Sequence, residues 1–248
     1  MTGNKMLAGK RIAVLATDGF EKEELNAPVA ALKAAGADVE IVSLHPGRIR
    51  GMNVHQPAEL VRVDKTVSDA RARDYDGLLI PGGYISPDQL RQSTQVRDFV
   101  RDFNSEGRPI ATLSHAPLVL ASAGLVGQRT LTSSAGARDD MVNAGATWLD
   151  QDVVRQANWL TGCGLQTVAK FVPEMMQLFA GAPDGNRALN QAHSDPQRQA
   201  PSELPGQSLR WLSTPSVGTM LSLALVGVGV MAATRGRGKE AKSATSSE

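Results

Sequence analysis

The sequence predicts an α/β domain with a mostly parallel sheet that is covered by helices on both faces. Short apolar runs, rich in β-branched residues, recur along much of the 248-residue chain, and stretches with helical spacing separate them. The runs are nearly continuous rather than alternating, which is typical of strands that are buried on both faces. Strands that alternate with helices favour a parallel sheet.

The predicted elements follow one another in a regular order. Residues 11–16 form the first strand, and a helix follows with apolar residues at Leu25, Val29 and Leu32 and an end at Gly36. The later elements are, in chain order, a strand at 38–44, a strand within 75–83 that runs into Gly-Gly, a helix at 94–104, a strand at 110–113, short strands in "RTLTS", "ATWLD" and "DVVRQANWLTG", and a closing helix at 165–180 with Pro173 as a kink.

Composition excludes several classes of protein. Lys and Arg number 26 against 25 Asp and Glu, so no net field recruits nucleic acid or acidic substrates. A single cysteine rules out a disulfide within the chain and a cysteine-rich metal site, and the four histidines lack a ligand spacing such as HExxH. We therefore expect no metal and no cofactor. No long apolar run precedes the first strand, so we expect a cytoplasmic domain without a signal peptide.

The chain beyond the domain has a different composition. We expect a domain at 1–181 and a flexible linker at 182–210, which is rich in Pro, Gln, Asn and Ser. A candidate transmembrane segment at 211–234 contains an uncharged stretch that begins at Val217 and ends at Ala233, and a basic, polar tail follows at 235–248.

The uncharged stretch is expected to tether the protein to a membrane. As a helix it would span about 26 Å, slightly less than the hydrocarbon core of about 30 Å. Trp211 precedes it and basic residues follow it, as at membrane interfaces. The alternative is a helix that packs on the domain. The topology stays open, because a cytoplasmic domain would place the basic end outside, against the usual tendency.

A sharp bend at Ser114 is the candidate centre of chemistry. The apolar run 110–113 stops at Ser114-His115, and a helix-compatible run follows at once. Hydrolases present a nucleophile on such a strand-to-helix turn.

Six spaced motifs give the chain a family resemblance. The motifs "VLATDGFEKEEL", "DGLLIPGG", "PIATLSHAP", "AGLVGQRTLTS", "RDDMVNAGATW" and "NWLTG" occur in this order. Together they resemble the PfpI family of intracellular proteases and stress proteins, in the class I glutamine amidotransferase-like superfamily. The resemblance covers residues 10–180. It implies a flavodoxin-like sandwich and a homo-oligomer, dimeric or larger.

The resemblance also assigns site residues. The family carries a cysteine in a motif like "CHGP", where this chain has "SHAP". Ser114 takes the cysteine position and His115 matches the family histidine. Glu24 matches a glutamate that contacts the thiol. Gly82 and Gly83 match a turn whose backbone N–H helps to build an oxyanion hole, together with the backbone at His115. By its position, Cys163 does not replace the missing thiol.

The serine changes the expected chemistry. A thiol ionises near neutral pH, whereas a hydroxyl needs a positioned base and a group that orients that base. Because His115 directly follows Ser114, we expect its ring to point away. Without the family match, Glu21, Glu23 and Glu24 would be solvated residues at a helix start.

Two functions of different classes follow, and the missing thiol favours the first. The chain is then a weak or non-catalytic, stress-associated binding or scaffold protein with a small carbonyl, amide or peptide ligand. The alternative is a hydrolase of the peptidase, amidase or glyoxal/deglycase type that uses Ser114, Glu24 and His115. A transcription regulator is disfavoured, since no helix-turn-helix module follows the domain.

Overall fold

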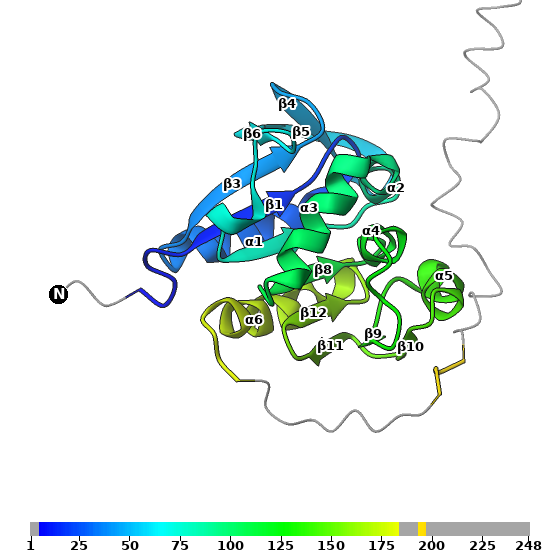
Figure 1. The fold of residues 1–248 in the computed structure, drawn as a ribbon. Helices are drawn as coiled ribbons and strands as arrows, with labels where there is room; N and C mark the ends of the chain where they lie inside the picture. The colour runs from blue at the N-terminus through cyan, green and yellow to red at the C-terminus, as the bar shows by residue number, and fades with distance from the viewer. Residues whose placement is uncertain (1–4, 184–192, 197–248) are drawn as a thin grey trace, which may run out of the picture. The chain divides into compact units, whose positions relative to one another are not determined.

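The computed structural model describes residues 5–183 and 193–196, which lie in one compact unit. A seven-stranded sheet forms its centre, in the order β11-β12-β8-β7-β1-β3-β6 (Figure 1). Its strands are β1 (Arg11–Leu15), β3 (Asp38–Ser43), β6 (Lys65–Thr66), β7 (Gly77–Ile80), β8 (Ile110–Leu113), β11 (Val153–Gln156) and β12 (Trp159–Gly162). All neighbours pair in parallel except β11 with β12. The predicted α/β class is therefore confirmed.

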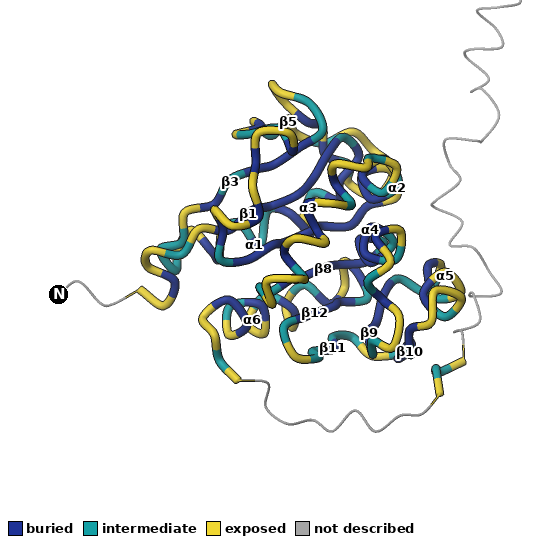
Figure 2. The backbone as a smooth tube through the Cα atoms, in the orientation of Figure 1, coloured by how far each residue is buried: buried dark blue, intermediate teal, exposed yellow. Residues whose placement is uncertain are grey.

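Helices cover both faces of this sheet, as the continuous apolar strands require. They are α1 (Lys22–Ala34), α2 (Ser86–Gln92), α3 (Thr94–Ser105), α4 (Pro117–Ser122), α5 (Arg138–Asn143) and α6 (Val168–Phe179), with short 3-10 turns η1 (Ala72–Asp74), η2 (Ala135–Ala137) and η3 (Leu165–Thr167). Central strands are buried along most of their length, whereas loops and outer helix faces are exposed (Figure 2).

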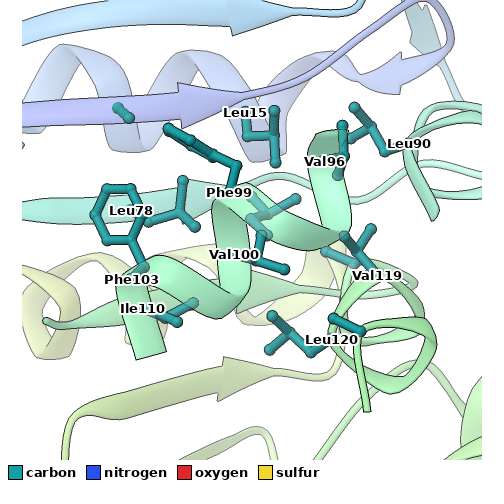
Figure 3. Packing of buried hydrophobic residues seen from close by; sticks show 14 of the residues in the cluster. Leu15, Leu78, Leu90, Val96, Phe99, Val100, Phe103, Ile110, Val119 and Leu120 are labelled. Atoms are coloured by element: carbon teal, nitrogen blue, oxygen red, sulfur yellow. The ribbon is translucent and has the colours of Figure 1, made fainter. Parts of the chain in front are cut away.

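The core forms two apolar clusters. In the first, side chains of α3 and α4, including Phe99, Phe103 and Leu120, pack on Leu78 and Ile110 of the sheet (Figure 3). The second contains the apolar residues of α1 and α6 together with those strand side chains that point the other way. The central strands β1, β7, β8 and β12 therefore contribute residues to both clusters from their two faces, which is why their apolar runs are nearly unbroken.

Two small sheets lie beside the central one. One pairs β9 (Thr130–Leu131) with β10 (Thr147–Trp148), and the other joins β2 (Phe20–Glu21), β4 (Arg48–Asn53) and β5 (Gln56–Arg62). Strands β4 and β5 were not predicted. Most of their residues are exposed or half-buried, so they lack the apolar face by which a strand is recognised in a sequence.

The C-terminal predictions fall mostly outside the described residues. The closing helix is present as η3 and α6, and α6 runs through Pro173 without interruption. Within the predicted linker, the Ser194 hydroxyl accepts a hydrogen bond from Trp148 N–H, and the Asp195 carboxylate accepts one from Asp150 N–H.

The stretch from Val217 to Ala233, predicted as a membrane anchor, lies outside the described residues. In residues 5–183 and 193–196, no helix is both long and apolar enough to cross a membrane.

Candidate active site

Ser114 stands at a strained turn at the end of β8, near the middle of the sheet. Its φ angle is 56°, in the left-handed region that non-glycine residues rarely adopt. Two backbone hydrogen bonds hold the turn: Ser114 N–H donates to Gly162 O at 2.9 Å, and Ser134 N–H donates to Ser114 O at 2.9 Å. Such strain persists only where the surrounding structure imposes it, and it is concentrated at functional sites.

His115 lies within hydrogen-bonding distance of this serine. Ser114 Oγ is 3.1 Å from His115 Nδ1, so the expectation that the ring points away was wrong. The left-handed turn at Ser114 is what brings the two neighbouring side chains together. Burial lowers the pKa of His115 below its ordinary value, so the ring is neutral near pH 7 and can accept a proton. The Tyr84 ring packs against it with centroids 4.8 Å apart.

Glu24, in the first turn of α1, is buried, with 2% of its surface exposed. Its Oε2 accepts a hydrogen bond from Gly82 N–H at 2.8 Å. Burial raises the pKa of Glu24 to about 7, the Gly82 hydrogen bond opposes that rise, and the nearby charge of Glu21 adds to it. Both forms of this carboxyl are therefore populated near neutral pH.

The Gly82-Gly83 turn follows β7 and separates Glu24 from Ser114. A Cβ at Gly82 would lie 2.4 Å from Glu24 Oε2 and 2.6 Å from Ser114 Cβ, so only glycine fits there. The Gly82 N–H is already bonded to Glu24. Gly83 has a φ angle of 102° and lines the cavity beside Ser114. The turn therefore holds Glu24 with one amide and presents its second glycine to the cavity.

A cavity of about 240 Å³ brings these residues together. Ser114, His115, Glu24 and Gly83 line it, so four of the five predicted site residues share one space. Gly82 is not among the lining residues, but its N–H donates the hydrogen bond that holds Glu24 at the cavity. In the part of the chain that the structure describes, no group of three or more His, Cys, Asp or Glu side chains could hold a metal ion.

Nine further lining residues were not predicted as parts of the site, among them Glu21, Tyr84 and Cys163. The expectation that Glu21 and Glu24 would be solvated without the family match was wrong, because both are buried and only Glu23 of the three is exposed.

Cys163 reaches the cavity because β12 is the neighbour of β8. Gly162 pairs with Leu113 in the parallel register, so Cys163 follows the end of β12 where Ser114 follows the end of β8. Its Sγ accepts a hydrogen bond from the Gln166 amide at 3.4 Å. The "NWLTG" motif predicted a strand that ends just before Cys163, but the neighbour of that strand is not visible in the sequence.

Comparisons with known proteins agree with this fold. The profile of the DJ-1/PfpI family matches residues 10–178. "Deglycase PfpI" from Pyrococcus furiosus is 37% identical over 151 residues, which cover 61% of this chain and 88% of that protein. "General stress protein 18" from Bacillus subtilis is 37% identical over 147 residues, 59% of this chain and 83% of that one. The crystal structure of Drosophila melanogaster DJ-1beta superposes with a TM-score of 0.64 at 26% identity, over 69% of this chain and 91% of that one.

Proposed function

We propose that this chain, which belongs to the DJ-1/PfpI family, is a hydrolase of the deglycase or amidase type that acts on small carbonyl derivatives of amines. Ser114 is its nucleophile, at the position that the resemblance gives to the family cysteine. The observation that carries the proposal is the 3.1 Å contact between Ser114 Oγ and His115 Nδ1 at a strained turn in a cavity. An activated serine needs such a base within hydrogen-bonding reach.

On an amide substrate, in which the carbonyl carbon itself carries the nitrogen, neutral His115 takes the hydroxyl proton while Ser114 Oγ forms a bond to that carbon. The tetrahedral intermediate then collapses, the C–N bond breaks, and the proton passes from His115 to the leaving amine. Water hydrolyses the resulting ester by the same steps and restores Ser114. Because burial lowers the pKa of His115, its ring is in the neutral form that the first step requires.

Backbone amides of Gly83 and His115 would hold the oxyanion in this proposal. Both residues line the cavity. The amides of Ser114 and Gly82 donate instead to Gly162 O and Glu24. Glu24 would keep the Gly82-Gly83 turn in place, and its pKa of about 7 lets it exchange a proton with the cavity near neutral pH.

The second candidate is a stress-associated binding protein with weak or no catalysis. The surroundings of the His115 ring favour this candidate. Among the described residues, the only hydrogen bond of the ring is the one to Ser114, and no carboxylate orients the ring. Triad hydrolases rely on such an orienting group. A homo-oligomer, inferred from the resemblance, is compatible with both candidates.

The two candidates are separated by turnover. The full chain would be assayed on methylglyoxal adducts of N-acetyllysine and on N-acetyl amino-acid p-nitroanilides. We expect Ser114→Ala to lower kcat/KM at least about a hundredfold. Ser122→Ala, an exposed serine of α4, is the matched control and should keep full activity. No turnover by the wild type, together with thermal stabilisation by these compounds, would favour the binding protein instead.

A further inference from the structure

The cavity at Ser114 has a one-sided charge. Two carboxyl residues, Glu21 and Glu24, line it, and none of its lining residues is Lys or Arg. Two lysines of neighbouring helices are paired with other carboxylates: Lys22 lies 3.5 Å from Glu23, and Lys170 pairs with Asp152. Among the described residues that line this cavity, a ligand therefore meets negatively charged side chains and no lysine or arginine.

Glu21 is the less satisfied of the two carboxyls. It is 7% exposed, and its Oε2 accepts a hydrogen bond from Val54 N–H at 3.0 Å. Its Oε1 is buried and accepts no hydrogen bond from any described group. A buried carboxylate oxygen without a donor is costly, and a positive charge brought close to it lowers that cost. This unpaired oxygen therefore favours a ligand with a positive charge in the cavity.

The two carboxyls also interact electrostatically. The charge of Glu21 is one of the causes that raise the pKa of Glu24, after burial. Both carboxyls are buried, so solvent screens the interaction between them less than it would at the surface. A charged ligand beside Ser114 would be exposed to the same field.

We propose that Glu21 makes this cavity select cationic and neutral ligands over anionic ones, as its specificity-determining residue. Applied to the proposed hydrolase, this favours substrates with an ammonium or guanidinium group near the carbonyl carbon and disfavours those with a carboxylate or phosphate. It rests on the proposed function only in taking this cavity as the binding site.

Cys163 offers a test that does not depend on catalysis. It lines the cavity, is half-buried and is the only cysteine of the chain. Two methanethiosulfonates differ in charge: one carries a trimethylammonium group and the other a sulfonate. In each reaction the thiolate forms a disulfide with the reagent sulfur and methanesulfinate leaves. The rate with the cationic reagent is divided by the rate with the anionic reagent, and this ratio is divided by the same ratio measured for 2-mercaptoethanol. The second division removes the intrinsic difference in reactivity between the two reagents, so the result reports the electrostatic potential at Cys163.

We expect the normalised ratio of cationic to anionic rates to exceed one in the wild type. Glu21→Gln should lower it about threefold to tenfold, while keeping an acceptor for Val54 N–H. The matched control is Glu23→Gln, which makes the same chemical change at an exposed residue that is not among the lining residues, and it should leave the ratio unchanged. Gln166→Lys, which adds a cation at the lining, should lower the ratio and shows that the reporter responds.

Two results would overturn the proposal. A wild-type ratio at or below that of the free thiol would do so whatever the variants show, including a Glu21→Gln variant that fails to fold. An unchanged ratio in folded Glu21→Gln would remove Glu21 as the source. If the charge selection is found but no substrate is turned over, the proposed hydrolase fails while this inference stands.

Discussion

Ser114 Oγ and His115 Nδ1, on consecutive residues, lie 3.1 Å apart at the end of β8. In an extended strand, successive side chains point to opposite faces and could not meet. The left-handed φ of 56° at Ser114 breaks that alternation and turns both side chains toward one cavity. The same left-handed turn therefore carries the backbone strain and produces the serine–histidine contact.

Replacing His115 tests whether it is the base. His115→Phe keeps a ring against Tyr84 but cannot accept a proton, so we expect kcat/KM to fall about a hundredfold. If the proposed reaction takes place, the wild-type chain should keep its activity below the ordinary histidine pKa of about 6.5, because burial lowers the pKa of His115. An acid limb centred at or above pH 6.5 would contradict this role.

Glu24 should make stability depend on pH. Its pKa is raised to about 7 in the folded chain, so the folded state holds this proton more tightly than the unfolded state. That contribution is complete below the unfolded value of about 4.5 and is lost as pH rises through about 7. Relative to Glu24→Gln, which mimics the protonated form, the wild-type free energy of unfolding should fall by up to about 3 kcal/mol over this window. Denaturant unfolding of both proteins between pH 4.5 and 8 measures the difference, and parallel pH profiles would show that burial does not perturb Glu24.

Gly82→Ala should disrupt the site by displacing the side chains of Glu24 and Ser114, which pack against Gly82. The added methyl group would meet Glu24 Oε2 at 2.4 Å, Ser114 Cβ at 2.6 Å and Leu113 O at 2.8 Å. We expect a loss of about 1–3 kcal/mol of stability and of most activity. Gly127→Ala is the matched control, because the nearest atom to its new methyl group is Ala144 O at 3.7 Å. Thermal melts and kcat/KM give both quantities, and equal melting temperatures for the two variants would show that the turn is not tightly packed.

The uncharged stretch from Val217 to Ala233 still predicts membrane attachment. We expect the full chain in the membrane fraction after carbonate extraction and a chain of residues 1–210 in the supernatant. Leu223→Asp with Leu225→Asp should release the full chain, since each aspartate costs about 3 kcal/mol at the centre of a membrane helix. A full chain that stays monodisperse without detergent would favour a helix packed on the domain.

The sequence alone determined the class of fold and the place of the bend. The runs at β1, β7 and β8 are almost entirely apolar on both faces, so burial could be predicted from composition, and the change of period after Leu113 marked Ser114. Because these signals are local, each needs only the chain on either side of it. The β4–β5 hairpin escaped prediction since it buries little and leaves no such pattern.

The family resemblance had already assigned Glu24, His115 and the Gly82-Gly83 turn to the site of Ser114, but only the tertiary structure decided how they meet and what else surrounds Ser114. Cys163 enters the cavity because β12 pairs with β8, and Glu21 and Glu24 enter it because the start of α1 is held against the turn after β7. Strand order and helix docking are set by how the two faces of the sheet are filled, which depends on all the elements together. The contact between Ser114 and His115 depends on one φ angle. That angle is held by two hydrogen bonds, one that Ser114 N–H donates to Gly162 O and one that Ser114 O accepts from Ser134 N–H, and both partners are distant in the chain.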